Sequence, residues 1–161
     1  MEELADATDS LRYLVARPGT FSDFYPETTD DMLIRVLVDG MAEAQLMGLL
    51  LDYDSDEDGI LTPALSSGQA AMVTIFAAVR FLRAELINRN TQVVYEAGST
   101  HYETTQATNI LRDILKGLVN QKDAVIALIG AGTGGASAFY MADQYLARVV
   151  HDWTSDAVIG W

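Results

Sequence analysis

The stretch from Ala70 to Ile87 constrains the fold most, because its apolar residues occupy nearly every face of a helix. A helix with this pattern has to be covered by other elements on all sides. Its charged residues argue against a membrane span, which needs about 20 mostly apolar residues with few charges. We therefore predict a central helix from roughly Gly68 to Asn88, capped by Ser66 or Ser67, in a mainly α-helical domain.

Three other segments have apolar residues at helical spacing. Residues 2–17 show weak periodicity, and a Pro-Gly pair ends it. Thr29 or Asp30 is a suitable N-cap for a helix that includes Met32 to Leu51. The most regular helix runs from Ala107 to Ile129. Its apolar stripe consists of Ala107, Ile110, Leu111, Ile114, Leu115, Leu118, Val119, Val125, Ile126 and Ile129, whereas Arg112, Asp113, Lys116, Gln121 and Lys122 fall mostly on the other side. These segments predict a small helical bundle.

The segments between these helices have different compositions. Thr20 to Pro26 is predicted to be an aromatic-bearing loop, and Asp52 to Pro63 an acidic loop. Val93 and Val94 favour a strand, and a turn-like Ala-Gly-Ser sequence follows them. We therefore predict an extended or hairpin-like connection near residues 91–105.

The C-terminal part of the chain is predicted to be an assembly arm. Four glycines between Gly130 and Gly135 form a joint, which separates a helical domain of residues 1–129 from an arm of residues 130–161. Aromatic side chains dominate interface hot spots, so they are the candidate interface residues. These residues are Phe139, Tyr140, Tyr145, Trp153, Trp161, Tyr95 and Tyr102. The alternative is that the aromatic residues of the arm complete the core of the domain itself.

The net charge of −13 is distributed unevenly. Residues 1–58 hold 15 acidic groups against three arginines, whereas residues 59–129 hold five acidic groups against six basic ones. An acidic first third cannot grip phosphates, because DNA binding needs cations that replace condensed counterions. It is either a solvated acidic surface or a surface past which DNA slides without specific binding.

Two segments partly match known ligand-binding motifs, and neither match is complete. Residues 54–59 open like a calcium-binding EF-hand loop, but Leu65 stands where the bidentate Glu is needed. The glycines of residues 130–135 match a dinucleotide fingerprint, and Asp152 lies about 20 residues further on. The sequence upstream is helical rather than alternating strand and helix, so a small nucleotide-binding enzyme or fragment is the alternative hypothesis. We predict no catalytic residue, no cofactor and no metal site.

Other residue types set further expectations. The chain has no cysteine, which removes disulfides, zinc thiolates and cysteine nucleophiles and fits a reducing compartment. His101 and His151 have no cluster of carboxylates at metal-binding spacing near them. The acidic first residues argue against a secretory signal. An assembly protein fits these features better than an enzyme does.

The stretch from Leu65 to Ile129 resembles the head-to-tail adaptor proteins, which form connector rings, of long-tailed bacteriophages that infect actinobacteria. The residues that carry the resemblance are Ala77-Ala78-Val79-Arg80-Phe81-Leu82, Tyr95-Glu96-Ala97-Gly98-Ser99 and Tyr102-Glu103-Thr104, followed by the leucine-rich helix. The resemblance covers about 65 residues.

The resemblance implies a helical subunit of a homo-oligomeric ring, typically a dodecamer, in the neck of the virion. Such a ring joins the portal protein to the next neck protein, the stopper, and leaves a channel for DNA without binding it specifically. Its C-terminal arm commonly reaches toward the portal. The resemblance also implies assembly in the host cytoplasm, with no membrane as a partner.

Overall fold

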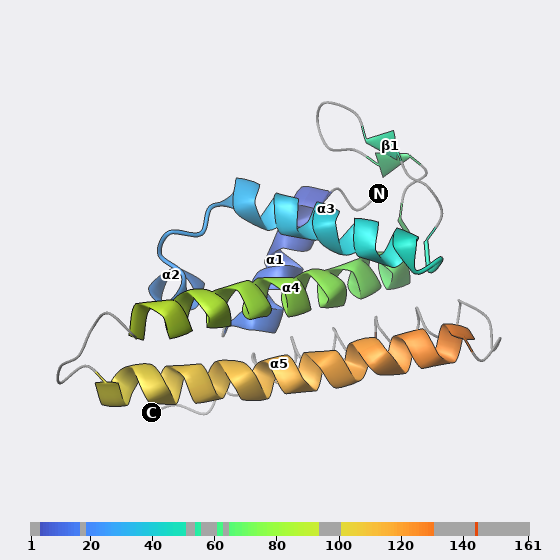
Figure 1. The fold of residues 1–161 in the computed structure, drawn as a ribbon. Helices are drawn as coiled ribbons and strands as arrows, with labels where there is room; N and C mark the ends of the chain where they lie inside the picture. Colours follow the sequence, from blue (N-terminus) through green and yellow to red (C-terminus); the bar gives the residue numbers. More distant parts are fainter. Residues whose placement is uncertain are drawn as a thin grey trace.

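The computed structural model describes residues 4–16, 19–50, 54–55, 61–62, 65–93, 101–130 and 144. Within this part of the chain, helices dominate, which confirms the predicted mainly α-helical bundle. The helices are α1 (Leu4–Val15), α2 (Phe21–Phe24), α3 (Asp30–Leu46), α4 (Ser67–Val93) and α5 (His101–Gly130), and the strands are β1 (Asp54–Ser55) and β2 (Leu61–Thr62). Figure 1 shows α3, α4 and α5 as three long helices that lie one beneath the other.

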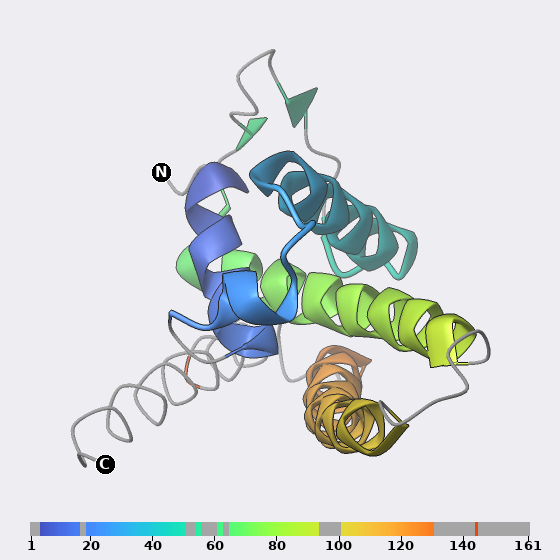
Figure 2. The same cartoon turned by 90° about the vertical axis from the view of Figure 1, so that its left-hand side faces the viewer.

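Helix α4 is the centre of the molecule, as its apolar pattern predicts. All residues from Ala70 to Val79 are buried. Figure 2 shows why, because α1, α3 and α5 lie on different sides of α4. Burying this many side chains is the main source of stability, since each large apolar side chain contributes about 1.5–3 kcal/mol.

Side chains at the helix starts supply the expected caps. The backbone N–H of Gln69 donates to Ser66 Oγ at 3.3 Å, and the Gln69 side chain accepts from Ser66 N at 2.9 Å. This reciprocal pair is a capping box at the start of α4. The N–H of Met32 donates to Thr29 Oγ1 at 3.4 Å at the start of α3. Helix α3 ends at Leu46, earlier than predicted, because Gly48 turns the chain with a φ of +70°.

Three predictions about the connections need correction. Residues 91–93 belong to α4 and residues 101–105 belong to α5, so the extended connection near 91–105 is wrong at both ends, and residues 94–100 lie outside the described residues. The strand preference of β-branched residues is weak, and a helix already packed on a core overrides it. The predicted loop from Thr20 to Pro26 contains α2. The acidic loop contains an antiparallel strand pair, in which Asp54 lies opposite Thr62.

Helix α5 follows the predicted stripe with two exceptions. Leu111, Leu118 and Val125 are buried against the rest of the bundle. Ile110, which the stripe includes, has 56% of its surface exposed, because it lies at the edge of a stripe too wide for one neighbouring helix to cover. Lys122, predicted on the outer side, is buried instead. The helix also extends through Gly130, the first glycine of the predicted joint.

Helices α3 and α4 approach each other closely at Gly40. A Cβ atom at this position would lie 2.8 Å from the backbone N of Ala77 and 3.0 Å from the backbone O of Val73. Atoms of two backbones cannot move aside as a flexible side chain can. Glycine is therefore required where the two helices cross.

We expect Gly40→Ala to lower the free energy of unfolding by about 1–3 kcal/mol, because the added methyl group forces the two helices apart. The matched control is Gly117→Ala in α5, where a Cβ atom would meet nothing within 4 Å. That change should raise stability by up to about 1 kcal/mol, since alanine favours a helix more than glycine does. Urea denaturation of both variants measures the difference. Equal stabilities would show that α3 and α4 are not in backbone contact.

Candidate functional site

A carboxylate connects the three long helices. Glu43 of α3 accepts a hydrogen bond from Lys122 of α5 and lies 3.5 Å from a guanidinium nitrogen of Arg80 in α4. Arg80 also lies 3.4 Å from Asp39, one turn earlier on α3. The Glu43 side chain is 21% exposed and that of Lys122 only 8% exposed, so the pair is shielded from solvent.

The ammonium group of Lys122 has a second partner. Its Nζ lies 4.3 Å from the ring centroid of Phe76, a fully buried residue of α4. A cation over an aromatic face is attracted by about 0.5–2 kcal/mol, and more when water is excluded. Helical spacing could have predicted that Lys122 is buried. It lies four residues after Leu118 and three before Val125, so it shares a helix face with two core residues.

The environment of Glu43 lowers its pKa below the usual value of 4.5. Burial raises the pKa, but the hydrogen bond and charge of Lys122, followed by those of Arg80, outweigh this effect. The carboxylate therefore stays ionised and holds α3 and α5 together. A buried lysine without such a partner would be strongly unfavourable.

A second cluster joins α2 to the C-terminal half of α4. Tyr25 packs edge-on against Phe81, with ring centroids 4.9 Å apart, and its hydroxyl donates to the backbone O of Val15 at 3.2 Å. Burial of the hydroxyl raises the pKa of Tyr25 to about 12, although the nearby positive charge of Arg89 opposes this. Tyr25 therefore remains a neutral hydrogen-bond donor.

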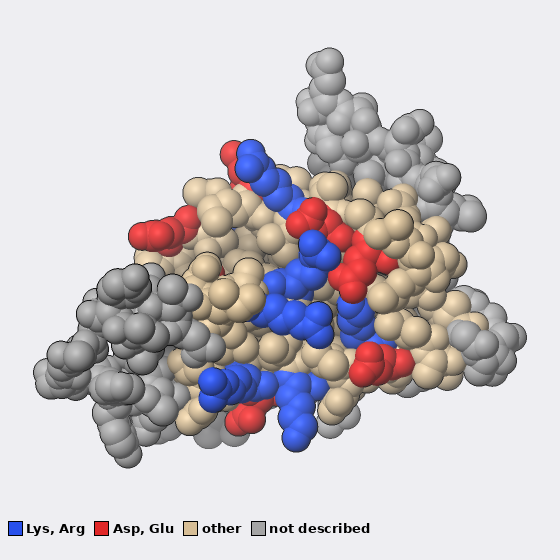
Figure 3. All heavy atoms as spheres, in the orientation of Figure 1, with Lys and Arg blue, Asp and Glu red and all other residues tan. Residues whose placement is uncertain are grey.

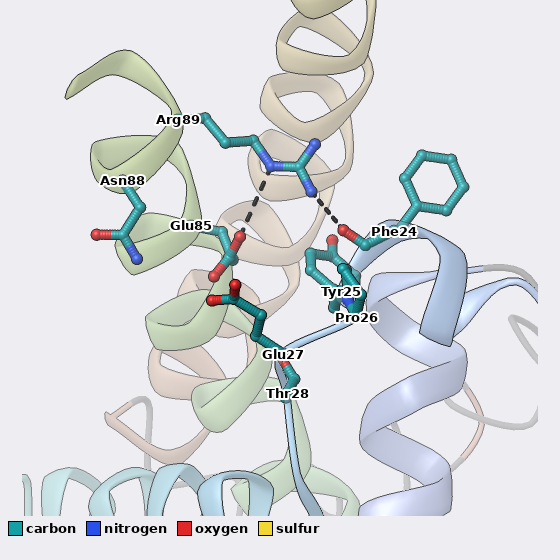
Figure 4. Close-up of a pocket in the computed structure, with 8 residues that line it drawn as sticks. All are labelled: Phe24, Tyr25, Pro26, Glu27, Thr28, Glu85, Asn88 and Arg89. Carbon is teal, nitrogen blue, oxygen red and sulfur yellow. Dashed lines mark hydrogen bonds and ion pairs between the residues drawn. The ribbon is translucent and has the colours of Figure 1, made fainter. Parts of the chain in front are cut away.

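Arg89 closes this cluster and leaves a cavity beside it. Its guanidinium donates to the backbone O of Phe24 at 2.7 Å and lies 3.6 Å from Glu85. The cavity has a volume of about 330 Å³, and Figure 4 shows Glu85 and Glu27 directing their carboxylates toward the same space. Its lining residues are Phe24, Tyr25, Pro26, Glu27, Thr28, Glu85, Asn88 and Arg89. Two carboxylates and one arginine leave the cavity with an excess of negative charge.

The surface of α4 and α5 carries most of the basic side chains on one face. In Figure 3, Lys and Arg gather over α4 and α5, whereas Asp and Glu lie over α3 and in smaller patches at the left-hand edge and over α5. We call Arg83, Arg112 and Lys116 the basic face. All three are exposed, and none forms an ion pair within the part of the chain that the structure describes.

The candidate residues proposed from the sequence are not assembled by the described part of the chain. Tyr102 falls in the first turn of α5. The other candidate interface residues lie outside the described residues, namely Phe139, Tyr140, Tyr145, Trp153, Trp161 and Tyr95. Most of the glycine run and Asp152 also lie outside them. The apolar run from Val125 to Ile129, which a dinucleotide fold would need as a strand, is the end of α5.

The described residues contain no group of three or more His, Asp or Glu side chains placed to hold a metal ion. None of the helices described here combines the length and apolar character that a membrane crossing requires. Comparison of the chain with family models, with curated proteins and with solved structures found no match.

We expect Glu43→Gln to destabilise the protein by about 3 kcal/mol, because it leaves the buried ammonium of Lys122 without a carboxylate. Asp39→Asn is the matched control, since it removes a carboxylate that also contacts Arg80 but is 60% exposed. Exposed ion pairs contribute little, so the control should change stability only slightly. Thermal or urea unfolding of both variants tests this. Equal losses of stability in the two variants would show that Glu43 contributes no more to folding than the exposed Asp39 does.

The lowered pKa of Glu43 predicts a pH dependence. A carboxyl group with a lowered pKa in the folded state adds stability above its unfolded pKa, and this stability is lost as the pH falls through the folded pKa. Stability should therefore decrease from about pH 4.5 downward. Lys122→Met should weaken this dependence because it removes the main group that lowers the pKa. An unchanged slope of stability against pH in that variant would contradict the assignment.

Proposed function

We propose that this chain is a structural subunit of a bacteriophage neck ring, which joins the portal to the next connector protein and surrounds a channel for DNA. The resemblance of Leu65 to Ile129 to adaptor proteins supports the proposal, and this stretch makes up α4 and most of α5. Its segment from Ala77 to Leu82 lies in the middle of α4, where only Arg80 is exposed.

The observation that carries the proposal is the position of α5 at the edge of the bundle. This 30-residue helix packs mainly against α4 and leaves a long outer surface beyond the other described helices. An edge helix with unpaired charges on its outer surface is suited to contact other subunits. Glu43 pairs with Lys122 and Arg80, and Arg89 pairs with Glu85 and the backbone O of Phe24. These contacts hold helices together, so the proposal assigns them structural roles.

The proposal gives residues 130–161 the role of an assembly arm that docks on a neighbouring subunit or on the portal. Its support is the sequence, with glycines first and large aromatic residues after them. Trp153 and Trp161 are the residues on which we expect docking to depend most, because tryptophan buries a large area at a small cost in entropy.

We expect the purified chain to form a ring of defined mass on purified portals from the same phage, measured by native mass spectrometry and electron microscopy. Trp153→Ala with Trp161→Ala should reduce ring formation while the helical circular dichroism stays the same. Tyr13→Ala, on α1 and distant from the arm in sequence, is the comparison that reports a general effect of losing an aromatic side chain.

Two results would count against the proposal. One is a chain that stays monomeric with every portal preparation. The other is saturable binding of NAD, FAD or ATP that is lost in Gly132→Val, which would support the nucleotide-binding alternative.

A further inference from the structure

The basic face brings together cations from two helices. Helices α4 and α5 run in opposite directions, and the contact between Lys122 and Phe76 fixes how they are aligned. Because both helices rise by the same distance per residue, Arg83 lies level with the part of α5 between Arg112 and Lys116. Three exposed cations therefore lie at the same level of the α4 and α5 pair, over which Figure 3 shows Lys and Arg side chains gathered.

The basic face has an excess of positive charge, because Asp113 is one exposed carboxylate beside three cations. Arg112 and Lys116 are four residues apart on α5, and like charges at that spacing repel by a few tenths of a kcal/mol. Arg80 lies nearby, but its positive charge is already balanced by Asp39 and Glu43. Opposite charges on another surface would relieve the repulsion.

The face also has an apolar element. Ile87 follows Arg83 by four residues on α4, and 67% of its surface is exposed. A large apolar side chain with cations beside it is a common feature of a protein interface, where contact removes the apolar surface from water.

The same chain carries a surface of opposite charge at α2 and the start of α3. We call Asp23, Glu27 and Asp31 the acidic end. All three are exposed and, like the basic face, have no ion pair among the described residues. Glu27 also lines the cavity into which Glu85 directs its carboxylate, so a basic side chain entering from outside would meet carboxylates on two sides.

We propose that the basic face of one copy binds the acidic end of the next copy, so that this contact, repeated, forms the ring. The inference rests on the proposed function, and it adds which two surfaces meet. Because the two surfaces differ, the contact is head-to-tail, and head-to-tail contacts close into rings when the rotation between copies permits. The uneven distribution of charge along the sequence then supplies both surfaces of one contact, the basic face and the acidic end.

A second copy fits the basic face better than nucleic acid does. Asp113 and Asp123 are exposed on α5, and the chain as a whole carries a net charge of −13. Both features repel phosphates, and a site with so few cations releases few counterions. The acidic end presents three carboxylates at fixed positions, so it can pair with the three cations without placing a continuous row of phosphates beside Asp113 and Asp123.

The test uses two full-length variants with reversed charges. The basic-face variant carries Arg112→Glu and Lys116→Glu, and the acidic-end variant carries Asp23→Lys and Glu27→Lys. None of these four residues takes part in an ion pair within the described chain, so folding should be retained, as measured by circular dichroism and melting. Light scattering and native mass spectrometry at low ionic strength give the mass of each assembly.

Each variant alone should self-associate at least about tenfold more weakly than the native chain, because like charges then face each other. A mixture of the two in equal amounts should assemble again, since each altered surface now meets an altered surface of opposite charge. The matched control is Arg35→Glu on α3, which makes the same charge change at an exposed arginine outside the basic face. Because Arg35 lies one turn after Asp31 of the acidic end, the added negative charge should not weaken assembly.

Five results would overturn the inference. The native chain could fail to self-associate at low ionic strength and high protein concentration, or both variants could assemble as the native chain does. The mixture could fail to assemble although both variants are folded. A loss of duplex DNA binding in the basic-face variant, with assembly unchanged, would assign the face to nucleic acid. Normal rings on portals from either variant would leave the proposed function in place and reject this contact alone.

Discussion

Burial of α4 on all sides is the constraint on which the rest of the structure depends. A helix that is apolar around its whole circumference cannot lie at a surface, so α1, α3 and α5 have to surround it. The other helices cover the C-terminal half of α4 less completely, and Arg80, Arg83 and Ile87 are exposed there. One helix therefore supplies both the centre of the core and part of the surface that we propose for assembly.

The polar groups between the helices follow from this packing. When α3 and α5 both lie against α4, their side chains meet over Phe76, and the pair of Glu43 and Lys122 fills that position. The pair costs solvation energy, and it is favourable only while both partners are present. It therefore favours one alignment of α3 with α5, which apolar contacts alone would specify less sharply. Arg89 has a similar role at the other end, where it fastens α2 to α4.

Patterns that depend on neighbouring residues could be predicted from the sequence, and contacts between distant residues could not. The central position of α4, the caps at Thr29 and Ser66 and the stripe of α5 all follow from local spacing and side-chain chemistry. The two ends of the connection near 91–105 were predicted wrongly, because the strand preference of Val93 is small beside the packing of a helix that has already formed, whereas residues 94–100 lie outside the described residues. The partnership of Glu43 with Lys122 joins residues 79 positions apart, so no local pattern contains it. The cavity beside Tyr25 likewise exists only after α2 has folded back on α4, and the aromatic residues of the arm lie outside the described part of the chain.

The crossing at Gly40 also limits how the bundle can change shape. Sliding α3 by one turn along α4 would place Val36 or Ala44 where the two backbones touch, and either Cβ atom would collide with Ala77. Rotation about the crossing point keeps Gly40 against Ala77, so it brings no Cβ atom into this backbone contact. Helices α3 and α4 can therefore change the angle at which they cross, but α3 cannot shift along α4 by one turn. Any adjustment of the subunit to a neighbour's curvature then has to come from that change of angle or from the edge helix α5.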